Sequence, residues 1–184
     1  MMCLDRCARS HLALRTTPLG ESMADAHSQG FTDAAELRRK NRATVETYLA
    51  DTKGPARLQR HELFVEHGSG GLWTNDTGEP LVIKGRDRLA EHGVWSLECF
   101  PDWEWYNIQV FETQDPNHFW VECDGHGKIR FPGYPEGYYE NHFLHSFVLD
   151  DGKIVQNREF MNPFEQLRAL GIPVPEIKRE GIPT

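Results

Sequence analysis

The sequence predicts an α+β fold in which a curved antiparallel sheet wraps around N-terminal helices and encloses a central cavity. Two observations support this prediction. Helix-forming segments dominate the first hundred residues, and four long strand-like segments with short turns between them fill residues 102–161. Helices followed by strands, rather than alternating with them, are typical of α+β domains. A sheet that curls around a helix forms a cone, so we expect a binding site at its open mouth.

The first predicted helix covers residues 33–50. Asp33 followed three residues later by Glu36 is a capping pattern, and the segment is rich in helix formers. Residues at helical spacing form its inward stripe, namely Ala34, Leu37, Asn41, Val45 and Tyr48. Within that stripe Asn41 is either a satisfied core amide or part of the pocket.

The next elements are two more helices with strands between them. A short helix begins at Pro55 and ends near Leu63. Segment 63–85 alternates apolar runs with glycine and turn residues, which predicts two short strands around a loop. A third helix covers residues 85–100 and ends before a proline.

The second half predicts a meander of antiparallel strands. Strand-like runs occupy residues 102–112, 118–131, 138–149 and 153–161, and the turns between them are "TQDPN", "PGYPEG" and "DDG". Consecutive hairpins produce antiparallel pairing. A last helix follows, with Asn162 as its cap and Gly171 at its end. We expect the proline-rich tail to lie on the surface or against a partner subunit.

Composition excludes several classes of protein. The formal net charge of −8 would repel a phosphate backbone, so nucleic acid is not an expected partner. The chain has no apolar run of about eighteen residues, so no membrane span is expected. Its four cysteines form no C-x-x-C pair, which favours a reducing cytoplasm over a disulfide framework. Residues 1–22 read as a flexible leader, added in cloning or by a misassigned start codon, before a single domain at 23–184.

The stretch "GYYENHFLHSF" at residues 137–147 contains the main candidates for chemistry. Side chains alternate between the two faces of a strand. The more aromatic face includes His145 and should point to the helices, while Glu140 and His142 should point outward or toward a second subunit. A β-bulge in this strand would reset the alternation and put Glu140 and His145 on one wall. The sequence does not locate such a bulge.

The neighbouring strand strengthens the case for a pocket. Trp120, Glu122, Asp124 and His126 alternate on one of its faces. A carboxyl group held among aromatic rings has its charged form disfavoured, which raises its pKa toward the range useful for proton transfer. A metal is the competing explanation for these acids and imidazoles. The chain lacks the spacing of a recognised metal motif, so we expect none.

The segment from Gly137 to Gly171 resembles the SnoaL-type branch of the ketosteroid-isomerase-like, or NTF2-like, superfamily. The motifs that carry this resemblance are Y-x-N-x-F from Tyr139, "DGKI" from Asp151 and "REF" from Arg158. From about residue 31 to the C-terminus, segments such as "RHELFVEHGSGGLWTNDTG", "CFPDWEWYNIQVFET" and "IPVPEIKREGIPT" resemble the phenazine biosynthesis A/B proteins.

That resemblance implies a small cytoplasmic homodimer with no metal or organic cofactor. It also implies a condensation of two molecules of an aminocyclohexenone carboxylic acid, in which each amine attacks the other molecule's ketone. Two imines form with loss of two waters, giving a tricyclic phenazine precursor. Imine formation requires a group that serves as both acid and base.

Within the resemblance, Glu140 is the expected proton carrier, with His145 as its first partner and His142 as its second. Arg42 on the first helix is the expected carboxylate clamp, although Arg38 and Arg39 are equal to it in composition. Other residues are assigned to substrate binding, namely Asn41, Trp73, Thr77 and Trp120. Core packing for the two tryptophans and a turn role for Thr77 are equally good readings.

Two other functions compete with the condensing enzyme. An isomerase, cyclase or hydratase would need an acid deep in the cone, for which Asp124 and Tyr106 are the candidates. The alternative is a non-catalytic binding or dimerisation module, because a fold does not determine a function.

Overall fold

The computed structural model describes residues 23–176 and 178–183, and the expected leader at residues 1–22 lies outside them. The helices of the described chain are α1 Met23–Ala50, α2 Gly54–Gln59, the 3₁₀ helix η1 Arg60–Leu63, α3 Arg86–Cys99 and α4 Pro163–Ala169. The strands are β1 Phe64–Leu72, β2 Leu81–Lys84, β3 Glu104–Glu112, β4 His118–Ile129, β5 Gly137–Asp150 and β6 Lys153–Met161. This order confirms the predicted α+β class.

In these residues the strands form one six-stranded sheet in the order β2-β1-β6-β5-β4-β3. Strands β3 to β6 pair antiparallel in sequence order, which confirms the predicted meander. Strand β1 pairs parallel with β6. The prediction of a wholly antiparallel sheet is therefore wrong at this pair. The long connection through α3 and the meander brings the chain back to β1, and it lets the two strands run in the same direction.

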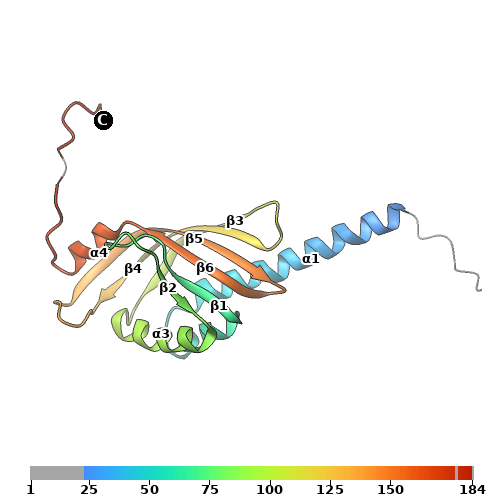
Figure 1. Ribbon diagram of the computed structural model, residues 1–184, viewed down its shortest axis with the longest axis horizontal. Helices are drawn as coiled ribbons and strands as arrows, with labels where there is room; N and C mark the ends of the chain where they lie inside the picture. The colour runs from blue at the N-terminus through green and yellow to red at the C-terminus, as the bar shows by residue number, and fades with distance from the viewer. Residues whose placement is uncertain (1–22, 177, 184) are drawn as a thin grey trace, which may run out of the picture.

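The helices cover one face of this curved sheet, and α1 extends well beyond it (Figure 1). Helix α1 begins at Met23, ten residues before the predicted start, and no proline interrupts it between residues 23 and 33. Its inward stripe is confirmed where it meets the sheet, since Asn41, Val45 and Tyr48 are buried. The core lies between this stripe and the inner face of the sheet, where Phe119 and Phe147 are fully buried.

The end of the chain follows the sequence prediction closely. The side chain of Asn162 accepts a hydrogen bond from the Phe164 backbone N–H and caps α4, with proline at the first helical turn. Gly171 follows the helix with a φ of 71°, the left-handed conformation that suits glycine. In the described part of the chain no helix is both long and apolar enough to cross a membrane.

Candidate active site

A cavity of about 300 Å³ lies between the inner face of the sheet and helix α3. This volume is at the lower end of the range for small-molecule sites. Most of the wall is aromatic or aliphatic, with Phe100, Trp103, Tyr139 and Phe143 among its rings. The charged and hydrogen-bonding side chains in the wall include Tyr48, Arg57, Arg60, His92, Ser96 and Glu159. The predicted cavity is therefore present, and most of its polar residues differ from those expected.

Glu159 on β6 provides a carboxyl group in the cavity wall. Its side chain is 19% exposed, and Tyr48 Oη donates to its Oε1 at 3.4 Å. Burial raises the pKa of Glu159, while the charge of Arg60, the Tyr48 hydrogen bond and the charge of Arg57 oppose that rise. A carboxyl group whose pKa is raised is suited to giving and taking protons near neutral pH.

Two arginines in the wall differ in how they are held. Arg57 is fixed by its neighbours, since its guanidinium donates to Phe100 O at 2.6 Å and to Ser96 Oγ at 2.7 Å. Arg60 lies over the Tyr48 ring, 3.7 Å from its centroid. The buried Nε and Nη2 of Arg60 have no hydrogen-bond partner within the described residues. Free guanidinium donors in a cavity are suited to binding a carboxylate.

His92 brings an imidazole to the cavity from α3. Its ring lies against Trp95, with the two ring centroids 5.6 Å apart. Burial, followed by the positive charges of Arg57 and Arg60, lowers the pKa of His92 to about 4. The imidazole is therefore neutral at neutral pH and can donate at one nitrogen and accept at the other.

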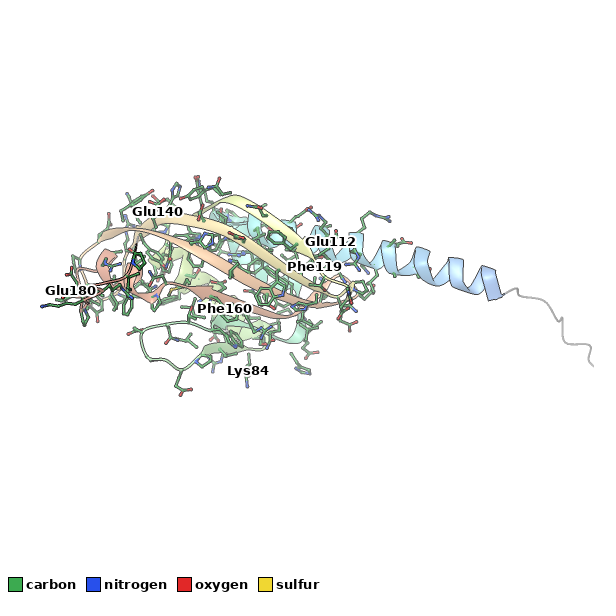
Figure 2. The ribbon with its side chains drawn as sticks, turned by 90° about the horizontal axis from the view of Figure 1, so that it is seen from above. Lys84, Glu112, Phe119, Glu140, Phe160 and Glu180 are labelled. Carbon is green, nitrogen blue, oxygen red and sulfur yellow. The ribbon has the colours of Figure 1, made fainter. Side chains whose placement is uncertain are left out.

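Glu140 and His142 are exposed on the outer face of the sheet, as the alternation predicts, so a role for Glu140 as proton carrier inside the cavity is not supported. The register between β4 and β5 runs without a shift from His118 to Ile129, so no bulge turns Glu140 inward. Glu140 is exposed on the outer face (Figure 2), where Tyr106 Oη donates to its Oε1 at 2.5 Å. The simple alternation predicted for this strand is confirmed.

The outer face also holds the candidates for the rival reactions. His142 Nδ1 lies 2.8 Å from Asp124 Oδ1, and its Nε2 lies 3.4 Å from Glu122 Oε1. Asn107 donates to the other oxygen of Asp124 at 2.8 Å. Asp124 and Tyr106 are therefore not deep in the cone, as an isomerase or cyclase using them would require. In the described part of the chain, no group of three or more His, Cys, Asp or Glu side chains is arranged to hold a metal ion.

His145 points inward as the alternation predicted, but it lies behind the cavity wall. Its side chain has no exposed surface, and it faces Glu159 across the β5–β6 pair. The separation between His145 Nδ1 and Glu159 Oε1 is 3.8 Å. The expected partner of the acid is therefore beside a carboxyl group, although that group is Glu159 rather than Glu140.

Only Thr77 among the expected substrate-binding residues lines the cavity. Arg42 is bound on the surface by Glu46 at 2.8 Å and Glu112 at 3.1 Å, so its role as a clamp is not supported. Asn41 is a satisfied core amide, since it donates to Pro116 O and Asn117 Oδ1 and accepts from the Gly152 N–H. Trp73 and Trp120 do not line the cavity.

The residues that sequence reasoning missed had partial signals. His92 and Ser96 lie four residues apart and so share a face of the third predicted helix. Glu159 alternates with Asn157 and Met161, which are buried on the inner face of β6. The "REF" motif that contains Glu159 indicates the fold and does not by itself indicate a site. Arg60 has no local signal, because its free donors depend on packing between distant elements.

The comparison with known families decides where the chain belongs. The family model for phenazine biosynthesis protein A/B matches residues 23–184. The chain belongs to the phenazine biosynthesis protein A/B family. Phenazine biosynthesis protein PhzB 2 of Pseudomonas aeruginosa strain UCBPP-PA14 is 79% identical over 160 residues, which is 87% of this chain and 98% of that protein. PhzA of Pseudomonas fluorescens is 70% identical over 156 residues, 85% of this chain and 95% of that protein.

Solved structures agree with this membership of the phenazine biosynthesis protein A/B family. The crystal structure of the phenazine biosynthesis-related protein PhzB2 from Pseudomonas aeruginosa is 80% identical, with a TM-score of 0.81 over 84% of this chain and 100% of that chain. A putative polyketide cyclase from Xanthomonas campestris pv. campestris gives a TM-score of 0.62 at 16% identity, over 73% of this chain and 98% of that chain. This second likeness supports the ketosteroid-isomerase-like fold and nothing beyond it.

Proposed function

We propose that this chain is a condensing enzyme of phenazine biosynthesis, working in the cytoplasm without a cofactor, with Glu159 as its proton carrier. The proposed substrate is an aminocyclohexenone carboxylic acid, two molecules of which are joined. The observation that carries the proposal is a carboxyl group of raised pKa in an aromatic cavity, beside an arginine with free donors. Membership of the family supports the pathway, and the cavity supports the chemistry.

The proposed reaction forms two carbon–nitrogen double bonds by the same steps. The amine nitrogen of one molecule attacks the ketone carbon of the other, giving a carbinolamine. The protonated form of Glu159 then delivers a proton to the departing hydroxyl group, which leaves as water. The resulting carboxylate takes a proton from the nitrogen as the imine forms, so the acid is regenerated. General acid–base catalysis of this kind contributes about 10²- to 10⁴-fold in rate.

The other polar groups of the cavity have roles that suit this substrate. The free Nε and Nη2 of Arg60 are proposed to hold a substrate carboxylate. His92, whose imidazole is neutral because its pKa is lowered to about 4, is proposed to accept a hydrogen bond from the uncharged substrate amine, the form that can attack a ketone. The aromatic wall would then hold the two rings against each other, and orientation of reactants can lower a barrier by several kcal/mol.

The substitution Glu159→Gln tests this proposal against Glu140→Gln as its matched control. Both changes remove one carboxylate from neighbouring strands of the same sheet, one inside the cavity and one outside it. We expect Glu159→Gln to lower the rate of tricycle formation at least 100-fold. The measurement is product formation by mass spectrometry, with the aminoketone generated in the reaction mixture and the uncatalysed rate subtracted.

The control and the binding assay separate the alternatives. Glu140→Gln should keep the rate within a few-fold of the unsubstituted protein. A binding titration with a bicyclic dicarboxylate mimic should show that Glu159→Gln still binds. Unchanged rates in Glu159→Gln with intact binding would instead favour a passive module that only holds the aminoketone.

We also propose that the chain forms a homodimer through the outer face of the sheet. Phe111, Trp120, Leu144 and Phe160 lie side by side on that face across four strands. Phe111 is 47% exposed and Leu144 is 42% exposed. An apolar patch of this kind on one face can pair with its own copy about a two-fold axis. Sedimentation analysis of Leu144→Glu should show a shift to monomer, and an unchanged dimer would place the interface elsewhere.

A further inference from the structure

His145 and Glu159 form a directly opposed pair inside the cone. They are register partners across β5 and β6, and both strands turn these side chains to the inner face. His145 Nδ1 lies 3.8 Å from Glu159 Oε1, which is just too long for a hydrogen bond. A small movement of either side chain would close this gap, and active-site hydrogen bonds are often long before a substrate binds.

Three aromatic rings surround the imidazole of His145. It lies parallel to Phe143, with centroids 6.0 Å apart, and to Phe147, with centroids 5.8 Å apart. The ring of Trp105 lies perpendicular to it, with the two centroids 5.0 Å apart. These three rings fix the plane of the imidazole, so its nitrogens have little freedom to seek other partners.

Neither nitrogen of His145 has a hydrogen-bond partner within the described residues, although the side chain is fully buried. Leaving buried polar atoms unpaired costs free energy, so such a group calls for an explanation. Burial, followed by the charge of Arg60, lowers the pKa of His145 to about 3. The imidazole is therefore neutral, with one N–H donor and one free acceptor nitrogen.

We propose that His145 is a positioning residue that donates its Nδ1–H to the carboxylate of Glu159 whenever Glu159 has given up its proton. This inference rests on the proposed function of Glu159 as the proton carrier. The hydrogen bond stabilises the ionised carboxyl group in a place where burial opposes it. It also fixes the orientation of Oε1 between the delivery of one proton and the uptake of the next.

The other groups that face Glu159 do not replace this donor. Arg60, Arg57 and Tyr48 act on it from η1, α2 and α1, and the Cys123 thiol on β4 has its pKa raised to about 12, first by burial and then by the charge of Glu159. The arginine charges are needed for the substrate carboxylate or are already bound elsewhere. The Tyr48 hydroxyl also lies 3.4 Å from Asn157 Oδ1, which competes with Glu159 for its single proton. His145 is the donor that stays neutral during the reaction.

The test compares His145→Phe, which keeps the packing and removes the donor, with His145→Asn, which keeps a donor near Nδ1. The readout is the titration of the Glu159 carboxyl carbon by NMR in ligand-free protein, assigned by its loss in Glu159→Gln. We expect the midpoint to rise by about one pH unit or more in His145→Phe, because a hydrogen bond to the charged form is lost. His145→Asn should return it toward the original midpoint.

Two controls keep the test decisive. His142→Asn changes an imidazole on the outer face of the same strand and should leave the midpoint unchanged. If His145→Phe fails to fold, nitrogen NMR of His145 in the unsubstituted protein should show Nδ1 protonated, with a shift that follows the ionisation of Glu159.

An unchanged midpoint in a folded His145→Phe, or a His145 signal that ignores Glu159, would overturn the proposal. Neither measurement needs a substrate, so the pairing is tested even if the condensation proves wrong. If the condensation is right, His145→Phe should also lower kcat more than it changes KM.

Discussion

Glu140 and Glu159 lie on neighbouring strands of one sheet but on its opposite faces. Glu140 is exposed and bound by Tyr106, whereas Glu159 lies in the wall of the cavity. The two carboxyl groups therefore have different surroundings, and burial raises the pKa of Glu159. Two glutamates on adjacent strands thus differ in role, because one is a solvated surface residue and the other is the proposed proton carrier.

Glu159 should lower the stability of the protein at high pH. Because its folded pKa is raised, the stability linked to its proton is present below the unfolded value of 4.5 and is lost as the pH rises through the folded value. We expect Glu159→Gln to be more stable than the unsubstituted protein at pH 8 by roughly 1–3 kcal/mol. Urea unfolding at pH 8 and pH 4 checks this, and an equal gain at both values would contradict it.

His92 should make the protein sensitive to acid. Its pKa falls from 6.5 to about 4 on folding, so its contribution to stability is present above pH 6.5 and is lost as the pH falls toward 4. The substitution His92→Gln should reduce the loss of stability between these values. Thermal unfolding at half-unit steps of pH measures the slope, with His142→Gln as the surface control. A slope that stays the same in His92→Gln would show that other groups cause the acid loss.

Arg60 should control affinity for a carboxylate, and Arg42 should not. Arg60→Gln removes charged donors that have no partner among the residues the structure describes, whereas Arg42 is already bound by Glu46 and Glu112. We expect Arg60→Gln to weaken binding of an aromatic dicarboxylate about 10- to 100-fold, since a hydrogen bond to a charged group contributes about 1.5–3 kcal/mol. Calorimetric titration measures both variants. Equal losses for the two would argue against a specific clamp.

Asn41 should matter for stability and not for binding. Its fully buried amide ties α1 to the β3–β4 turn through Pro116 and Asn117, and to the β5–β6 turn through Gly152. We expect Asn41→Leu to destabilise the protein by about 2–4 kcal/mol, because several buried partners lose their hydrogen bonds. Urea unfolding measures the loss, with Arg42→Ala as the neighbouring control. A change in ligand affinity without a loss of stability would revive the pocket role.

Much of the fold could be predicted because its signals are local. The Asn162 cap, the glycine at position 171 and the turns of the meander depend on residues adjacent in sequence, and the structure contains each of them. The alternation of β5 was also local, and it placed His145 inside and Glu140 outside correctly. The assignment of Glu140 to proton transfer needed a bulge in β5, which the sequence does not locate and which the pairing with β4 lacks. In the β3–β4 pair the register shift lies on β3, after Tyr106. It adjoins Asn107, whose φ is 51°.

The sequence by itself determined the class of fold and the face on which each β5 side chain lies, because helix periods, strand alternation and turn chemistry act over a few residues. The family followed from the resemblance of whole segments to its members. Only the tertiary structure decided which acid meets the cavity. The cavity residues come from three distant elements, namely Glu159 from β6, Arg60 from η1 and His92 from α3. They meet because β6 returns to pair beside β1 and α3 packs against that part of the sheet. The burial of Glu159, the charge of Arg60, the Tyr48 hydrogen bond and the charge of Arg57 set the pKa of Glu159, and they exist only once distant segments are in contact.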